Sequence, residues 1–431
     1  MLCLCNLILA ICVAGVFANL PLVEFRNVTK SWSAPKPVIW IYDKHLVKND
    51  HSFLYANCKA ASDLSFTNSK EDTTGCECSV TVEMPTLIPD AVTRVRTCNM
   101  KHRVPSFGVM SNPAYIVLEV LGDDRVLIRW KERYPDKKNN PFISFEETGP
   151  ATMRMAILNM IDCSIKALEF SNEVRWSQGP VQEVITSSDT FDVFFSNKTL
   201  CGSSQCRIKY DKDGNEVGEP VPFYTSLRIP SVMDPSPDKP SFFLVGFPAD
   251  HLGKLALRYV NANGTEKNLT DTFKNIDTTR YSNDHELLGF CWTFKNKTTQ
   301  CKQFDSDANV LIDITFELDS NGYILSIHNQ KNGGILILTA NIEEKMNDRF
   351  ETLFEIVGDT FKVSKIGNNT GVEELYNMRK FEFQCNNKNE YSLDVDYVES
   401  NEEFCFYFVC PYSDENTADS TLTLSKRCAT K

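Results

Sequence analysis

Short segments in which hydrophobic and polar residues alternate recur along this chain. The segment Ser392–Tyr397 alternates polar and apolar residues at every position, as a half-buried antiparallel strand requires. Runs such as Tyr115–Leu121 and Arg125–Trp130 have the same strand-like composition. One polar stretch, Thr339–Phe350, has a helix-like period instead. The pattern predicts an all-β protein with little or no helix.

Three turn tetrapeptides of one type punctuate these strands. They are Asp211–Gly214, Asn261–Gly264 and Asp319–Gly322, and each ends in glycine after a short alternating segment. An Asx residue caps such a turn, and glycine adopts the positive φ that the turn requires. We therefore expect hairpins at all three places. The first two should occupy equivalent positions in neighbouring structural units.

The hairpins recur at a spacing typical of a repeat fold. The first five spacings between successive hairpin units run from about 36 to about 51 residues, the length of one four-stranded propeller blade. The sequence thus predicts a β-propeller of about six to eight blades, and two packed β-sandwich domains are the alternative. The units begin near Tyr115, Met153, Phe191, Phe242, Leu287, Tyr323, Phe350 and Phe381.

The chain divides into three stretches of different composition. Residues 1–18 resemble a signal peptide, residues 19–104 are rich in cysteine, and residues 105–431 contain the repeated hairpins. The cysteine-rich stretch is expected to be β-structured and to include the first blades. A second break is conceivable at the proline-rich stretch Pro230–Pro240, which inside a propeller would be a blade-to-blade loop.

The first 18 residues predict secretion. An apolar run, Leu2–Ala18, ends in the small-residue pattern that signal peptidase recognises, so we expect cleavage after Ala18. No second apolar stretch of bilayer-spanning length follows. The mature protein is expected outside the cell, with no membrane span.

Cysteine usage agrees with an oxidising compartment. Removing Cys3, Cys5 and Cys12 with the signal leaves 13 of the 16 cysteines. Bridges are expected for the closely spaced pairs Cys201–Cys206 and Cys291–Cys301, with further bridges within an N-terminal and a C-terminal group. These groups are Cys58, Cys76, Cys78 and Cys98, and Cys385, Cys405, Cys410 and Cys428. Cys163 is left over and is predicted to be a buried free thiol.

N-glycosylation is expected because the chain contains Asn-x-Ser/Thr acceptors in a secretory context. Several lie at or beside predicted hairpin loops, where a glycan has room. The six acceptors are Asn27, Asn197, Asn263, Asn268, Asn296 and Asn368.

Charge and motifs exclude several functions. The net charge is −12, with 57 acidic and 45 basic residues, which argues against nucleic-acid binding because that requires clustered Lys and Arg. The sequence contains no Gly-x-Ser-x-Gly elbow, no His-Glu-x-x-His motif and no phosphate-binding glycine loop. No catalytic residue, metal ligand or cofactor is predicted.

Two acidic segments come nearest to a chemical site. Asp284-His285-Glu286 is the one compact acid–base cluster, and we interpret it as a solvated strand edge. Asp305–Asn309 has spacing typical of a calcium loop, but Val310 and Phe316 stand where an EF-hand needs glycine and glutamate. His328 ends a predicted strand.

The function predicted from the sequence is extracellular binding. A disulfide-bonded glycoprotein with a β scaffold would present loops to a protein or small-ligand partner. One alternative is an extracellular hydrolase-type enzyme whose carboxylates converge in a central pocket. A structural or storage protein is the other alternative, and oligomeric state is not predicted.

Overall fold

A computed structural model describes most of the chain between residues 22 and 430. The described part of the chain forms 29 β-strands, and no helix in it is long and apolar enough to cross a membrane. The described residues are 22–23, 25–35, 38–42, 53–59, 77–83, 95–99, 116–122, 124–133, 151–168, 183–186, 190–195, 201, 205–234, 236, 239–248, 255–270, 276–331, 333–346, 352–367, 371–379, 393–400, 403–413 and 418–430. The predicted signal peptide, residues 1–18, lies outside them.

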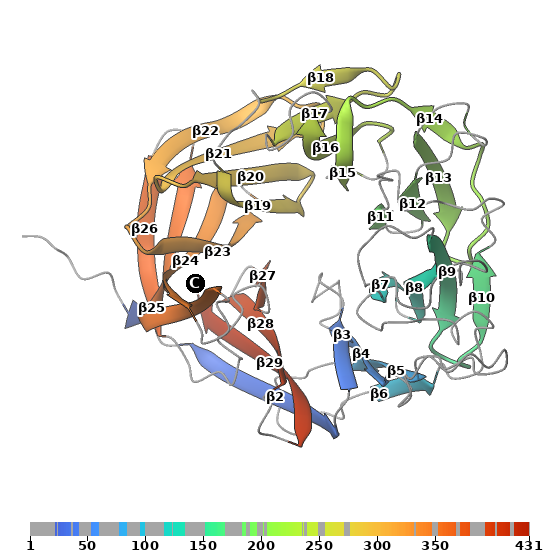
Figure 1. Cartoon of the computed structure of the whole chain (residues 1–431). Coiled ribbons are helices and arrows are strands. Elements are labelled where there is room, and N and C mark those ends of the chain that lie inside the picture. The colour runs from blue at the N-terminus through green and yellow to red at the C-terminus, as the bar shows by residue number, and fades with distance from the viewer. Residues whose placement is uncertain are drawn as a thin grey trace, which may run out of the picture.

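Seven antiparallel sheets stand around a common centre (Figure 1), so the protein is a seven-bladed β-propeller. In each blade the chain begins at the innermost strand and moves outward strand by strand. The predicted propeller is confirmed, with a blade number inside the expected range. Two packed sandwiches are excluded because each sheet has its own innermost strand at the ring centre.

The blades are numbered here in chain order. Blade 1 contains β3 (Val38–Tyr42), β4 (Phe53–Lys59), β5 (Glu77–Glu83) and β6 (Val95–Asn99). Blade 2 contains β7 (Val117–Gly122), β8 (Arg125–Arg133), β9 (Ala151–Asn159) and β10 (Ile165–Leu168). Blade 3 contains β11 (Glu183–Thr186), β12 (Thr190–Phe195), β13 (Gln205–Asp211) and β14 (Val221–Phe223). Blade 4 contains β15 (Leu227–Met233), β16 (Phe242–Pro248), β17 (Ala256–Val260) and β18 (Glu266–Asn268).

The last three blades complete the ring. Blade 5 contains β19 (Ile276–Asp284), β20 (Leu287–Phe294), β21 (Thr298–Asp305) and β22 (Val310–Glu317). Blade 6 contains β23 (Gly322–Asn329), β24 (Ile335–Met346), β25 (Thr352–Gly367), β26 (Gly371–Arg379) and the short β1 (Leu22–Val23). Blade 7 contains β27 (Asp394–Glu399), β28 (Glu403–Ser413), β29 (Asp419–Thr430) and β2 (Arg26–Pro35).

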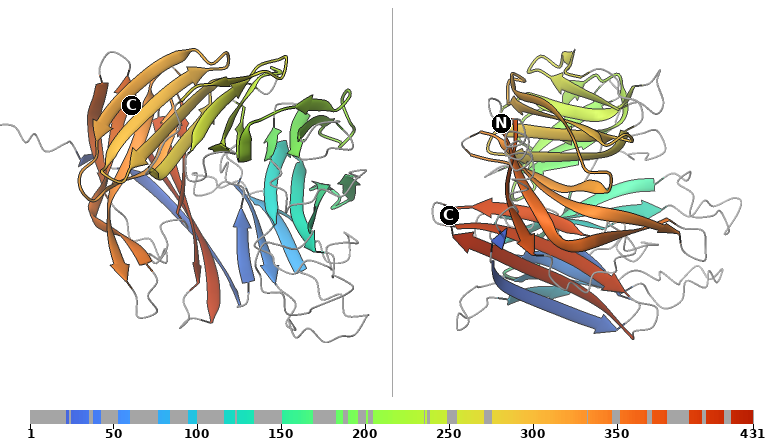
Figure 2. Two further views of the ribbon diagram at one scale, coloured as in Figure 1. Left: turned by 45° about the horizontal axis from the view of Figure 1, so that its top comes forward. Right: turned by 90° about the vertical axis from the view of Figure 1, so that its left-hand side faces the viewer.

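The N-terminal strands close the ring. All ten residues of β2 pair antiparallel with β29, so the first long strand forms the outer edge of the last blade, as both views of Figure 2 show. Just before it, β1 pairs parallel with β26 at the edge of blade 6. The two ends of the chain are thereby held in neighbouring and shared sheets.

The hydrophobic core is divided into seven clusters, one between each pair of adjacent blades. For example, one cluster contains Phe194 of blade 3 and Phe242 of blade 4. Another joins Tyr407 of blade 7 to Phe53 of blade 1 across the closure. Each blade therefore buries both faces against its neighbours, which explains why the middle strands of the blades are rich in apolar and aromatic residues.

Three expectations about local structure are wrong. Thr339–Phe350 is not a helix, because residues up to Met346 continue β24 and pair with β25. The expected hairpin between 350 and 366 is one long strand, β25. The proline-rich stretch connects β15 to β16 inside blade 4 rather than linking two blades, and Pro230 falls where the register of that pair shifts.

The disulfides include both predicted local pairs. Cys201 is bonded to Cys206 and Cys291 to Cys301, and Cys405 joins Cys428 inside the C-terminal group. Cys58 and Cys410 are also disulfide-bonded. The predicted free thiol is wrong, because Cys163 is bonded to Cys98.

The Cys98–Cys163 bond connects two blades. Cys98 lies in β6 of blade 1 and Cys163 in the turn after β9 of blade 2. The sequence suggested pairing inside an N-terminal group because those cysteines are near one another along the chain. The ring instead brings together residues separated by 65 positions.

Candidate functional site on the turn rim

The third and fourth strands of blades 2 to 5 are joined by short turns, which the alternating strand directions place on one face of the ring. We call this set the turn rim. It consists of residues 159–164, 211–215, 261–265 and 305–309. The connection between β15 and β16 opens on the same face, because first-to-second and third-to-fourth connections share it.

Three of these turns use the same hydrogen bonds. In blade 3, Asp211 Oδ1 accepts from the backbone amides of Asp213 at 2.9 Å and Asn215 at 2.8 Å. Asn261 makes the equivalent pair of bonds in blade 4, and Asp305 makes them in blade 5. The Asx side chain at the first position thus fixes each five-residue turn.

The predicted equivalence of the first two tetrapeptides is confirmed, but the third was misassigned. Asp319–Gly322 connects β22 of blade 5 to β23 of blade 6. The blade 5 equivalent is Asp305–Asn309, where Ala308 takes the positive φ (62°) that Gly214 and Gly264 take in the other two turns. An alanine at this position concealed the repeat in the sequence. The same hydrogen bonds also explain the calcium-like spacing as a turn.

These bonds change the acidity of the turn carboxyl groups. Slight burial raises the pKa of Asp211, but hydrogen bonds from Asn215 and Asp213 outweigh that effect and lower it overall. The pKa of Asp305 is lowered through the same balance, with bonds from Asn309 and Asp307. Both carboxylates are therefore ionised at neutral pH.

The turn of blade 3 is attached to blade 2. Lys166 Nζ donates to Asp213 O at 2.6 Å and to Asn215 Oδ1 at 2.8 Å. Gly214 packs so closely that an added Cβ would lie 2.5 Å from Leu168 Cδ2 and 2.8 Å from Ile157 Cδ1. A polar contact and a close apolar contact together fix this turn against its neighbour.

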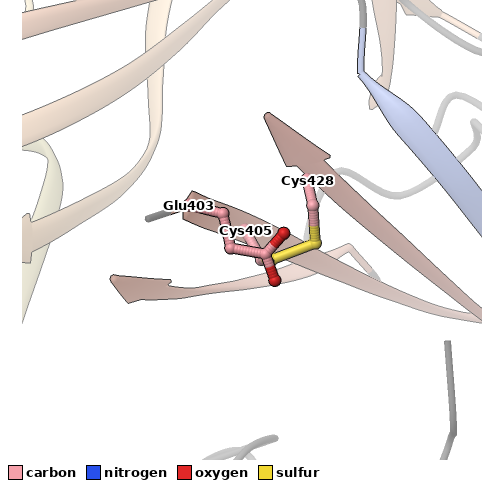
Figure 3. Close-up of side chains that lie close together, drawn as sticks. All are labelled: Glu403, Cys405 and Cys428. Carbon is pink, nitrogen blue, oxygen red and sulfur yellow. A yellow bond between two sulfur atoms is a disulfide. The ribbon is translucent and has the colours of Figure 1, made fainter. Parts of the chain in front are cut away.

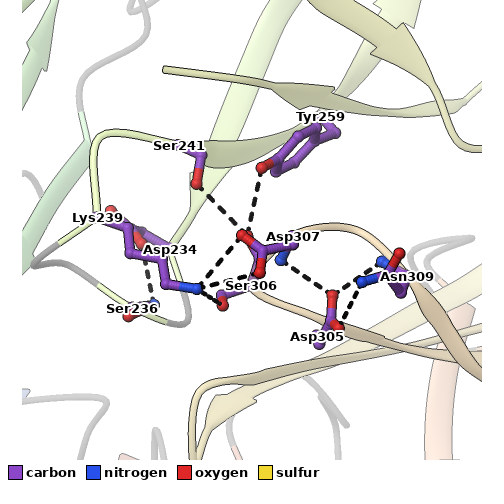
Figure 4. Close-up of polar contacts among 9 residues, drawn as sticks. All are labelled: Asp234, Ser236, Lys239, Ser241, Tyr259, Asp305, Ser306, Asp307 and Asn309. Carbon is purple, nitrogen blue, oxygen red and sulfur yellow. Dashed lines mark hydrogen bonds and ion pairs between the residues drawn. The ribbon is translucent and has the colours of Figure 1, made fainter.

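The turn of blade 5 is attached to blade 4 (Figure 4). Lys239 Nζ donates to Ser306 Oγ at 2.5 Å and contacts Asp307 Oδ1 at 3.3 Å. Ser241 and Tyr259 both donate to the Ser306 carbonyl, at 3.4 Å each. This turn therefore accepts hydrogen bonds from three side chains of the preceding blade.

Blade 3 holds the β15–β16 connection from its other side. Arg207 NH1 donates to Pro240 O at 3.0 Å, while its NH2 donates to Asp192 Oδ2 at 2.8 Å. The guanidinium also lies over the rings of Phe194 and Phe242. Arg207 is thus a buried bridge between blades 3 and 4.

Asp234 is the most perturbed carboxyl group near this connection. It is 1% exposed, its Oδ1 accepts from Ser236 N at 3.1 Å, and its Oδ2 has no hydrogen-bond partner. Burial raises its pKa to about 7, against the lowering effect of Arg207. Asp192 adds to the rise by like-charge repulsion. The group can therefore take up or release a proton near neutral pH.

The rim combines polar turns with exposed apolar side chains. Ile161 is 65% exposed in the turn of blade 2, and Val217 is 46% exposed just after the turn of blade 3. In the described residues these are the exposed large apolar side chains of the rim segments and the residues flanking the blade 3 turn. A fixed polar framework with projecting apolar groups is a surface suited to a protein partner.

A serine, histidine and aspartate come together at the inner strands, but they do not form a catalytic triad. His328 Nε2 lies 2.9 Å from Ser326 Oγ on β23, and Asp284 is its acidic neighbour. His328 is buried against the rings of Tyr397 and Phe406. Burial lowers its pKa to about 4, so neither accessibility nor basicity suits catalysis at neutral pH.

Asp284-His285-Glu286 is exposed in the turn between β19 and β20. His285 and Glu286 have positive φ values of 58° and 59°, and Asp284 accepts from Ser282 Oγ at 2.9 Å. In the described residues no second acidic or basic side chain bonds to this turn. Its role is that of a turn at the inner end of blade 5.

One group of potential metal ligands is explained by other bonds. Glu403, Cys405 and Cys428 lie close together at blade 7 (Figure 3). The two sulfur atoms are bonded to each other, and Glu403 forms an ion pair with Arg26. This cluster therefore does not have the free thiolates that a zinc site needs.

Three glycosylation acceptors are exposed in the described structure. Asn263 lies in the turn of blade 4, Asn268 ends the outer strand β18, and Asn296 lies in the turn between β20 and β21. Asn27 lies on β2, while Asn197 and Asn368 fall outside the described residues. Cys76 and Cys385 also fall outside them.

Sequence reasoning missed Asp234, Arg207 and Lys239. Asp234 follows the apolar strand β15 and precedes a proline, a weak signal of a capped turn. The partners of Arg207 and Lys239 are between 15 and 68 positions away, so local patterns could not have identified them.

Comparison with known proteins places the chain by fold alone. No protein-family model matches it, and no curated protein matches its sequence. Oligogalacturonate lyase from Vibrio parahaemolyticus has a similar structure, with 7% identity, a TM-score of 0.43, and coverage of 95% of this chain and 98% of that chain. A mutant of AofleA from Arthrobotrys oligospora has 6% identity, a TM-score of 0.38, and coverage of 82% and 91%.

A luciferin-regenerating enzyme is also similar, with 9% identity, a TM-score of 0.33, and coverage of 90% of this chain and 95% of that chain. Similarity at this level concerns architecture and transfers no activity. The chain is a disulfide-bonded seven-bladed β-propeller.

Proposed function

We propose that this protein is a secreted, disulfide-bonded glycoprotein that binds an extracellular protein partner through the turn rim. The bonded cysteines fit an oxidising compartment. The observation that carries the proposal is that the rim turns are fixed before any partner arrives, by Asx bonds and by Lys166 and Lys239. A surface that is already ordered loses less entropy on binding.

Ile161 is the side chain through which the rim can be tested. A photo-crosslinking amino acid replaces Ile161 in one variant and Tyr224 in another. Both native residues are 65% exposed, but Tyr224 follows β14 on the opposite face of the ring. After illumination in extracellular fluid, crosslinks from position 161 alone are expected, and mass spectrometry identifies the partner.

The affinity for the identified partner then provides a quantitative check. Ile161→Lys should weaken binding by about tenfold or more, because a charge replaces an apolar contact. Tyr224→Lys should change the affinity by less than about twofold. Equal crosslinking from both positions, or equal affinities of both variants, would contradict the proposal.

A hydrolase-type enzyme is the second candidate, and Asp234 is the observation that favours it. A carboxyl group with a pKa of about 7 has the acidity that suits a general acid or base. Assays on glycosidic and ester substrates would compare Asp234→Asn with Asp211→Asn. A loss of about a hundredfold or more in the first variant alone would support catalysis, whereas no turnover by the wild type would exclude this role for the substrates tested.

A further inference from the structure

A strip of cations lies on one face of the strand pair that closes the ring. In the pairing of β2 with β29, Val28 stands opposite Lys426 and Lys30 opposite Leu424. Directly paired residues, and residues two positions apart, project from the same face of an antiparallel pair. Arg26, Lys30 and Lys426 therefore share one face. We call these three residues the seam strip.

The seam strip faces blade 1. Trp32 and Leu424 lie on the same side of the strand pair and pack in the core cluster with Phe53 and Tyr55 of blade 1. Trp32 lies 4.7 Å from the Tyr55 ring, measured between centroids. The strip thus continues the packed seam between the last and first blades toward the outer edge of the sheet.

Aromatic rings hold the two lysines in place. Lys426 is 5% exposed, and its Nζ lies 5.2 Å from the ring centroid of Tyr407. Lys30 Nζ lies 5.4 Å from the ring centroid of Trp32. A lysine stem packed on an aromatic face has lost most of its rotamer freedom already, so a ligand binding its ammonium group would lose little further entropy.

The charge of the strip is incompletely balanced. In the described part of the chain, Glu403 is the carboxylate that faces it, paired with Arg26 and acting on Lys426. Burial lowers the pKa of Lys426 despite Glu403, and Arg26 lowers it further. Burial also lowers the pKa of Lys30. An added anion would relieve both effects.

We propose that the seam strip is a binding site for the sulfate or carboxylate groups of an acidic extracellular polysaccharide. Cations two residues apart on a strand are separated by about 6.6 Å along the chain, which suits successive anionic groups on a linear polymer. A local cationic strip also stands out on a protein with a net charge of −12. This site is on blades 7 and 1, apart from the turn rim, and does not depend on it.

Binding of a heparin-derived hexasaccharide tests the site. Lys30→Met and Lys426→Met remove the charge but keep an unbranched stem against the ring, and Lys267→Met on the exposed outer strand of blade 4 is the matched control. Titration calorimetry in 50 mM salt should show binding to the wild type and to Lys267→Met. Each strip variant should bind about three- to tenfold more weakly, with the salt dependence reduced by about one ion per lysine.

The desulfated hexasaccharide and inorganic sulfate separate the sources of the anion. The desulfated sugar should not bind, and sulfate should compete only at a large molar excess. Equal affinity of the strip variants and Lys267→Met would overturn the proposal, as would an absence of binding to the wild type. Inorganic sulfate binding as tightly as the hexasaccharide would overturn the assignment to a polysaccharide. Thermal unfolding of each variant confirms that it is folded.

Discussion

Replacing Asp234 with asparagine should remove a large part of the alkaline sensitivity of the fold. The pKa of this carboxyl is raised from an ordinary 3.8 to about 7 by burial. The protonated form is therefore favoured in the folded protein and the ionised form in the unfolded chain. The stabilisation is fully present below pH 4 and is lost as the pH rises from about 4 to about 7.

The size of the effect follows from that shift. A rise of about three pKa units corresponds to about 4 kcal/mol between the two ends of the pH range. Asparagine is nearly isosteric with the protonated acid and keeps an acceptor for Ser236 N. Wild-type and Asp234→Asn proteins should thus be similar at pH 4, and the variant should be more stable at pH 8.

Urea unfolding between pH 4 and pH 8.5 measures this difference. Asp211→Asn is the matched control, because asparagine already occupies the equivalent turn position at Asn261 and the pKa of Asp211 is lowered rather than raised. Its pH profile should run parallel to the wild type over this range. If the free energy of unfolding falls between pH 4 and pH 8 as much in Asp234→Asn as in the wild type, Asp234 is not the buried titrating group.

Three other perturbations give distinct expectations. Because burial lowers the pKa of His328 to about 4, wild-type stability should fall by about 3 kcal/mol as the pH drops from 6.5 to 4, a loss that His328→Gln should lack in acid titrations. Gly214→Ala should lower the urea midpoint more than Gly218→Ala, by about 1 kcal/mol, since both glycines have positive φ but only Gly214 would place a Cβ against neighbours; equal effects would refute the close packing. Non-reducing peptide mapping should recover a peptide linking Cys98 to Cys163, and replacing both with serine should cost about 4 kcal/mol, whereas a free Cys163 thiol would contradict the bond.

The fold class was readable from the sequence because its determinants are local. Alternating strands and Asx turns specify hairpins over fewer than 20 residues, and each blade consists of consecutive hairpins. Blade boundaries were less accessible. The chain from Val117 to Leu168 reads as two hairpin units, yet it folds into one sheet whose second and third strands are joined by a long connection. Loop length, which no periodicity encodes, separates the units in the sequence.

The candidate site was less predictable because its contacts cross blade boundaries. The Asx turns are local, and two of the three were found. The attachments of those turns, through Lys166 and Lys239, join residues 47 and 67 positions apart. Neither lysine occurs in a recognisable motif, and each becomes informative only when the ring places one blade beside the next.

Ring closure shows most directly why composition along the chain does not define units of folding. Residues 19–104 differ from the rest in cysteine content, yet this stretch supplies β2 to blade 7 and all four strands of blade 1. Trp32 packs on Phe53 within the stretch, while the same cluster includes Tyr407 and Leu424 near the C-terminus. Without β2, the outer edge of β29 would be unpaired and this cluster would lose Trp32. The first and last hundred residues therefore stabilise one another, and the closing sheet assembles only when both are present.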